Sequence, residues 1–245
     1  MIKIISLIMF TGMVVMNYLA NALPIGGKTT GQISAEYPNL FVPAGITFSI
    51  WGVIYLLLAV YSVLQFFPGR IRDVPEAAGW LFSVSCLLNG MWILAWHYER
   101  LPLSVIIMTG LLVSLILINF LIRNIPFGIT KAAFGIYLGW ICIATIANIT
   151  ALLISINWNG LWISGEIWTL IMITAGALIV IPSLVKLNNP FIGLAAIWAF
   201  SGIVIRQHAD YRLIAGFALA MIIAVGVFTG LVFFSTQFSF AGSRV

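Results

Sequence analysis

The chain has 245 residues and a formal net charge of +5; 62% of its residues are hydrophobic and only 7% are charged. Soluble domains carry about 25% charged residues, so this composition excludes a water-soluble globular protein. The basic residues lie in short connections between apolar stretches, which indicates membrane topology rather than a nucleic-acid partner.

Apolar stretches that are long enough to cross a bilayer recur along the whole chain. A membrane-spanning helix needs roughly 20 mostly apolar residues. Eight stretches of this kind occur, the seventh of them short: residues 4–23, 45–67, 78–97, 103–122, 132–155, 165–185, 191–205 and 213–236. Only helices and closed barrels satisfy their backbone in lipid, and these runs lack the alternation of barrel strands. We therefore predict an all-α integral membrane protein, a polytopic bundle of about eight transmembrane helices.

The first stretch and the distribution of charge predict the topology. The first apolar run is long for a signal peptide and "ANALPIGG" only loosely resembles a cleavage site, so we expect a retained first helix. Seven basic residues fall on the side of the N-terminus and four on the other: Lys3, Arg70, Arg72, Arg123, Lys131, Lys186 and Arg244 against Lys28, Arg100, Arg206 and Arg212. This excess predicts a multi-pass protein of the cell membrane with both termini in the cytoplasm.

Side chains that carry catalysis or bind metals are scarce. Cys86 and Cys142 lie near the middle of predicted spans, where thiols behave as small hydrophobic groups, so we expect neither a disulfide nor a metal site. His97 and His208 lie at predicted helix ends without a Cys, Asp or Glu at ligand spacing. The sequence offers no Ser-His-Asp set and no carboxylate pair. We therefore expect no enzyme activity, no catalytic residue and no cofactor.

Small residues recur at four-residue spacing in two of the predicted helices. Gly135 and Gly139 form one such pair, and Gly226 and Gly230 form another. Pairs of this kind allow the backbones of two helices to approach closely. We expect ordinary packing within the bundle; contact between two copies in a homodimer is the alternative.

The second predicted helix follows a Pro, a Gly and several aromatic residues, in the stretch "NLFVPAGITFSIWGVIY". Pro43 and the Gly after it favour a clean helix start. Trp51 and Tyr55 are four residues apart and therefore share a helix face. An aromatic belt at the membrane surface would account for Phe41 and Phe48. Because Tyr55 lies about two turns further in, we interpret its face as one wall of a pocket, with Pro43 and Phe48 at the mouth.

Asparagine is the polar residue that recurs inside the spans, at positions Asn17, Asn21, Asn89, Asn119 and Asn148. An amide in hydrocarbon is costly unless it is hydrogen-bonded, so these side chains should face the interior of the bundle. Two explanations are equally good from the residues alone. The amides either join helices, at about 0.6 kcal/mol each, or line a cavity together with Trp51, Trp92 and Trp140.

A family resemblance carried by three stretches of the sequence favours the cavity explanation. "FVPAGITFSIWGVIY", "LLNGMWILAWHY" and "YLGWICIATIANITALL" occur in this order on the second, third and fifth predicted spans. In order and approximate spacing they resemble the tryptophan-rich sensory protein family (TspO, or translocator protein). The resemblance covers roughly residues 4–155, which correspond to the five helices of that family.

The resemblance implies a ligand pocket between helices. In that family the matching positions line a pocket that takes porphyrins and synthetic isoquinoline- or benzodiazepine-type ligands. Carried over by position, the implied ligand-binding residues are Pro43, Phe48, Trp51, Tyr55, Asn89, Trp92, Trp140, Ala144 and Asn148. Two features depart from the family pattern: its double Pro is Pro43-Ala44 here, and Ile46 stands near the place of a Trp. The entrance is therefore remodelled, which affects the identity of the ligand more than the fold.

The expected organisation is a five-helix unit, residues 1–155, with additional transmembrane helices in residues 156–245 packed on it in a single membrane domain. The expected function is binding of a hydrophobic planar molecule, of which a tetrapyrrole is one, for sensing, sequestration or transport. The expected partners are this ligand and membrane lipid. A secondary transporter of a small solute is one alternative, although midplane charges are almost absent. A structural or regulatory membrane subunit is the other.

Overall fold

The computed structural model describes residues 1–23, 25–71 and 74–241, with side chains placed up to residue 235. Arg72 and Arg244, which contribute to the charge count, lie outside the described residues. Eight long helices occur within the described ranges: α1 (Ile2–Ala22), α3 (Ile50–Leu64), α4 (Glu76–His97), α5 (Leu101–Leu121), α6 (Ile129–Ser155), α7 (Gly165–Lys186), α8 (Phe191–Gln207) and α9 (Arg212–Ala241). A six-residue helix, α2 (Thr30–Ala35), and three short 3₁₀ turns complete the described secondary structure.

The long helices correspond to the eight apolar stretches of the sequence. Seven described segments are long and apolar enough to cross a membrane, including Gly45–Leu64, which joins the 3₁₀ turn η2 (Gly45–Ser49) to α3. The helix α8 has 17 residues and falls short of that length, as expected for the seventh stretch. The prediction of an all-α polytopic membrane protein is confirmed.

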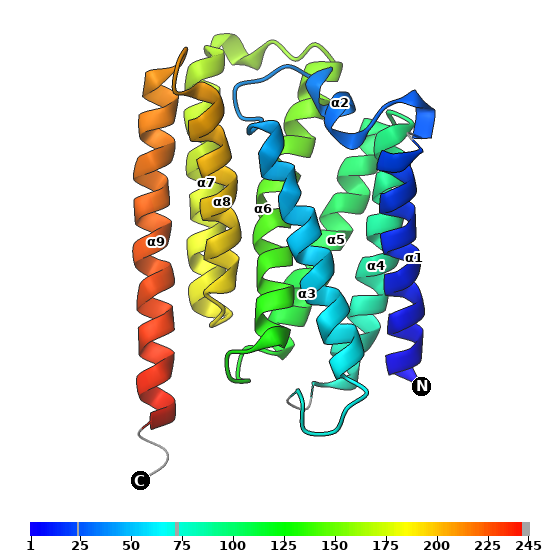
Figure 1. Cartoon of the computed structure of the whole chain (residues 1–245). Coiled ribbons are helices and arrows are strands. Elements are labelled where there is room, and N and C mark those ends of the chain that lie inside the picture. The colour runs from blue at the N-terminus through cyan, green and yellow to red at the C-terminus, as the bar shows by residue number, and fades with distance from the viewer. Residues whose placement is uncertain (24, 72–73, 242–245) are drawn as a thin grey trace.

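The long helices run up and down beside one another, and consecutive helices are antiparallel (Figure 1). The chain enters α1 and leaves α9 at the same end of the bundle, the lower end in the view, which agrees with eight crossings. The helices α7, α8 and α9 lie on one side of the others, next to α6. The segment between α1 and α3, which contains α2, covers the upper end.

The charge bias gives this arrangement a testable orientation. A cysteine in place of Gly31 should react with an impermeant maleimide on intact cells, because the bias places the upper end outside. Gly31 is exposed, and an added Cβ would meet nothing within 4 Å. The native Cys86 and Cys142 are buried and should give little background. Arg70→Cys, at the opposite end, is the control that should react only after lysis; the reverse pattern would invert the topology.

The connections at the ends of α6 and α7 follow ordinary capping chemistry. Asn157 and Asn188 adopt left-handed backbone conformations, with φ of 53° and 47°. The amides of the residues that follow them bond back to carbonyls five residues earlier, Trp158 to Leu153 and Asn189 to Leu184. This is the pattern of a helix that stops on a left-handed residue, a conformation that Asn tolerates.

The glycine pair in α6 allows α8 to pack directly on it. A Cβ at Gly139 would collide with the backbone carbonyl of Ile192, and a Cβ at Gly135 would lie 2.8 Å from Cβ of Phe191. Gly135 and Gly139 therefore serve contact within the chain. At the second pair, Gly226 would meet only Ile197 at 4.0 Å and Gly230 nothing within 4 Å.

A buried lysine joins the connections at the lower end of the bundle. The charge count treats Lys131 as a loop residue, but the structure places it in the first turn of α6 with a fully buried side chain. Its Nζ donates to the carbonyl oxygens of Arg123 and Asn188, each at 2.7 Å. These carbonyls follow the C-termini of α5 and α7, where the helix dipole is negative, so each interaction stabilises the ammonium group.

Candidate functional site

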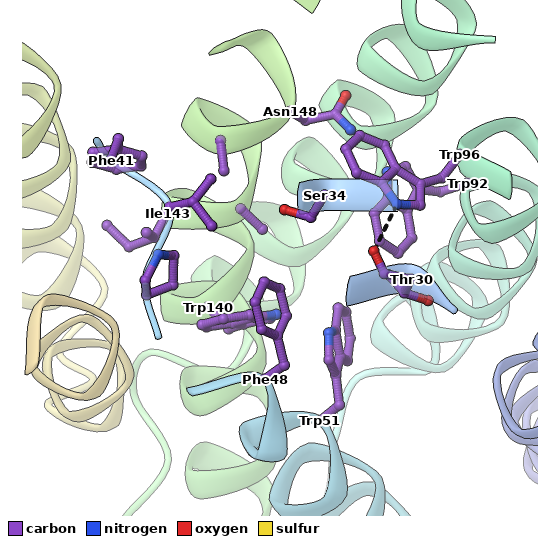
Figure 2. Close-up of a pocket in the computed structure, with 14 residues that line it drawn as sticks. Thr30, Ser34, Phe41, Phe48, Trp51, Trp92, Trp96, Trp140, Ile143 and Asn148 are labelled. Carbon is purple, nitrogen blue, oxygen red and sulfur yellow. Dashed lines mark hydrogen bonds between the residues drawn. The ribbon is translucent and has the colours of Figure 1, made fainter. Parts of the chain in front are cut away.

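A small cavity of about 60 Å³ lies between α3, α4 and α6 beneath the segment that contains α2 (Figure 2). Its lining brings together seven of the nine residues that the sequence analysis names: Pro43, Phe48, Trp51, Trp92, Trp140, Ala144 and Asn148. Figure 2 shows Phe48, Trp51 and Trp140 on one side of the cavity, and Asn148 with Trp92 and Trp96 on the other.

Aromatic rings form most of the wall. Trp51 stacks on Tyr55 with ring centroids 5.6 Å apart, which confirms that the two share a face of α3. It also stacks on Trp92 at 6.2 Å and meets Trp140 edge-on at 6.1 Å. Phe48 meets Trp140 edge-on at 5.9 Å. These separations lie within the range of favourable aromatic pairs, so the rings hold one another in place from three different helices.

Several polar atoms at this wall are buried without a hydrogen-bond partner within the described residues. They are the indole nitrogens Nε1 of Trp92 and Trp140, the amide nitrogen Nδ2 of Asn148 and the hydroxyl oxygen Oγ1 of Thr30. The other end of the Asn148 amide is used, because its Oδ1 accepts from Ser104 Oγ at 3.0 Å. Three of the four orphaned atoms are N–H donors, so the wall is complementary to a molecule that carries acceptors.

A second, larger hollow of about 580 Å³ adjoins the cavity on the side of α1. Thr30, Phe48, Trp51 and Trp92 line both spaces and so form the partition between them. Tyr55 lines this second hollow rather than the smaller cavity.

The structure does not bring Asn89 to either wall. Asn89 is fully buried, and its Oδ1 accepts from Asn17 Nδ2 at 2.7 Å while its Nδ2 donates to the Tyr137 hydroxyl at 2.8 Å. These bonds join α4 to α1 and α6. Asn119 is bonded in the same manner, to the Phe134 carbonyl oxygen and to Asn189 Nδ2. Both explanations of the asparagines therefore hold, each for different residues.

We expect Asn89→Leu to lower the stability of the protein and Asn148→Leu to lower its affinity for ligand. Asn89→Leu removes the bonds to Asn17 and to the Tyr137 hydroxyl and leaves Asn17 Nδ2 only its bond to the Met13 carbonyl. The expected cost is about 1 kcal/mol in the free energy of unfolding. Asn148→Leu breaks only the bond from Ser104 and should lower ligand affinity instead. Thermal unfolding in detergent and ligand titration separate the two. Equal loss of stability in both variants would contradict this distinction.

The last helices hold the entrance of the site in place. The amide of Ala44 donates to the Gly202 carbonyl at 3.0 Å, and Trp198 Nε1 donates to the Thr47 carbonyl at 2.8 Å. Gln207 Nε2 donates to the Leu40 carbonyl at 2.7 Å. All three α8 residues thus contact the segment 40–47, which carries Pro43 and precedes Phe48.

The segment that contains α2, which forms the cover of the cavity, is held by ion pairs at the upper end of the bundle. Thr30 and Ser34 of α2 line the cavity, and Lys28 just before them bonds to Glu99 at 3.2 Å and to Glu36 at 2.8 Å. Hydrogen bonds from Lys28 and from the Tyr37 hydroxyl lower the pKa of the Glu99 carboxyl, and the two carboxylates raise the pKa of Lys28. The contacts are solvent-exposed and individually weak.

Some of the further lining residues can be predicted from the sequence, and others cannot. Trp96 lies four residues after Trp92, and Ile143 and Ala147 lie three and seven residues after Trp140, so helical periodicity points to all three. The residues from the cover, among them Thr30, Ser34 and Phe41, have no such signal, because nothing local says where a loop folds back.

Comparison with known proteins identifies the family of this chain. The sequence model described as TSPO-like protein matches residues 3–231. The chain belongs to the TSPO-like protein family. The match continues past residue 155 through α7 and α8 into α9, so the family likeness is not confined to the first five spans. Comparisons with curated proteins and with solved structures gave no match. The division of this TSPO-like membrane protein at residue 155 stays a prediction.

Proposed function

We propose that this TSPO-like protein binds a hydrophobic, planar small molecule of the tetrapyrrole type between α3, α4 and α6. The observation that carries the proposal is the group of unpartnered polar atoms on an otherwise aromatic wall. A buried donor without a partner costs about 1–3 kcal/mol. A flat ligand with acceptor groups would satisfy Trp92, Trp140 and Asn148 while its faces pack against the indole rings.

The size of the two spaces sets a condition on this binding. Small-molecule sites usually measure about 300–1,000 Å³. The smaller cavity, at about 60 Å³, is far below that range, whereas the adjoining hollow of about 580 Å³ lies within it. Trp140 and Asn148 line only the smaller cavity, so a tetrapyrrole that enters from the hollow must displace part of the partition to reach their N–H groups.

The same lining supports binding rather than catalysis. The residues around both spaces include no Asp, Glu, His, Lys or Cys, so no acid–base pair faces a ligand there. The absence of charge at these walls also disfavours an ion-coupled transporter. Sensing, sequestration and transport of the ligand all begin with the proposed binding step.

The direct test is a fluorescence titration of the detergent-purified protein with a porphyrin. Trp51, Trp92 and Trp140 lie at the proposed site, so a bound porphyrin should quench their emission in a saturable manner. We expect a dissociation constant in the micromolar range, a free energy near −8 kcal/mol. Porphyrin that merely partitions into detergent gives quenching that rises linearly without saturation. If no saturable quenching is seen in addition, the tetrapyrrole assignment is refuted.

A further inference from the structure

A groove of about 850 Å³ lies outside the proposed ligand site, between α6 and α7. Its walls are the last turns of α6, the first turns of α7 and the connection between them. Residues 38–40, the end of α8 and the connection after it complete the lining. Figure 1 shows this connection crossing the upper end of the bundle between α6 and α7. Neither the proposed function nor the family match assigns the groove a role.

The groove is polar at one end and apolar along the rest. Trp158 and Trp168 meet edge-on at 4.9 Å near its rim, and Trp168 Nε1 donates to the Gly160 carbonyl at 2.6 Å. Tryptophan is enriched at the membrane–water interface, which places this rim at headgroup level. Below the rim the walls are apolar, and Ile149 and Ile171 remain about 40% exposed, so the groove is open to lipid on its side.

The length of the groove corresponds to one leaflet of a membrane. Its lining on α7 runs from Gly165 to Ala175, and ten residues of helix rise by about 15 Å. The hydrocarbon core of a bilayer is about 30 Å thick, so each leaflet contributes about 15 Å. An acyl chain from one leaflet therefore fits along the groove.

Two opposite charges at the polar end have no ion-pair partner among the described residues. Arg206 and Asp210 line the rim and are exposed. Among the described residues the only ion pairs join Lys28 to Glu36 and to Glu99, so neither rim charge is paired within the chain. A guanidinium beside a carboxylate is complementary to a head that carries both a phosphate and a primary ammonium group.

We propose that this groove binds a zwitterionic phospholipid of the phosphatidylethanolamine type. The phosphate lies at Arg206, the ammonium group lies at Asp210, and one acyl chain runs between α6 and α7 towards Ala175. A quaternary ammonium head has no N–H to donate to Asp210, and a glycerol head has no positive charge. The ethanolamine head is therefore preferred over choline and glycerol heads.

Native mass spectrometry of the full-length protein tests this proposal. The protein is released from detergent in the presence of equimolar phosphatidylethanolamine, phosphatidylcholine and phosphatidylglycerol with the same acyl chains. We expect one phosphatidylethanolamine to be retained preferentially. Arg206→Gln should lower its retention about tenfold, because a charge-assisted hydrogen bond is lost. Asp210→Asn should remove the preference over phosphatidylglycerol.

Two further variants make the result decisive. Arg212→Gln removes an exposed charge at the same end of the bundle that does not line the groove, and it should leave retention unchanged. Ala175→Phe fills the apolar end and should reduce retention without altering either charge. The proposal is overturned if Arg206→Gln behaves like Arg212→Gln, or if all three heads are retained equally in the unaltered protein. Porphyrin quenching is read separately, so failure here is distinct from failure of the proposed ligand site.

Discussion

Replacement of Trp140 by leucine should weaken porphyrin binding about tenfold, or about 1.4 kcal/mol. Trp140 is 3% exposed, packs edge-on against Phe48 and Trp51, and carries one of the unpartnered N–H groups of the cavity. Leucine removes both the flat surface and the donor. Saturation titration of tryptophan quenching, normalised to the starting emission of each variant, measures the change.

Two matched variants separate affinity from general damage to the fold. Trp162→Leu also removes one emitter, but Trp162 is 92% exposed in the connection between α6 and α7, so its affinity should equal that of the unaltered protein. Trp140→Phe keeps one aromatic ring while losing the indole N–H and the second fused ring, so its affinity should fall less than that of Trp140→Leu. Identical dissociation constants for Trp140→Leu and Trp162→Leu would exclude Trp140 from the site.

Substitution of Gly139 by alanine should lower the free energy of unfolding by about 1–3 kcal/mol, the usual cost of overpacking. The added methyl group meets the Ile192 carbonyl and lies 2.9 Å from Cβ of Ala195, and neither can rotate away because both are fixed by the backbone of α8. Separation of α6 from α8 should also reduce porphyrin affinity, since α8 bonds to Ala44 and Thr47 at the entrance. Thermal unfolding in detergent and the quenching titration report the two effects.

Gly216→Ala in α9 is the matched control for this substitution. An added Cβ at Gly216 meets nothing within 4 Å. Alanine favours a helix over glycine by up to about 1 kcal/mol, so this variant should be unchanged or slightly more stable. If Gly139→Ala is as stable as Gly216→Ala, the close contact between α6 and α8 is not a determinant of stability.

The sequence by itself determined the class of fold and much of the aromatic wall. Hydropathy counts apolar residues over about 20 positions, and helical periodicity relates residues four apart, so both depend only on neighbours in the chain. These local signals placed the eight helices and put Trp51 and Tyr55 on one face. The family resemblance favoured a cavity lined by Trp92, Trp140 and Asn148 and added Ala144, and the structure brings all four to the cavity.

Only the tertiary structure decided which residues form hydrogen bonds between helices and which face the cavity. Asn89 and Asn148 look alike in sequence, yet Asn89 is bonded on both sides to α1 and α6, while Nδ2 of Asn148 has no partner among the described residues. Lys131 reads as a loop cation, yet two helix C-termini enclose it. Each outcome depends on which groups from other helices come within hydrogen-bond distance, about 3 Å, and only the packing of the whole bundle fixes those distances.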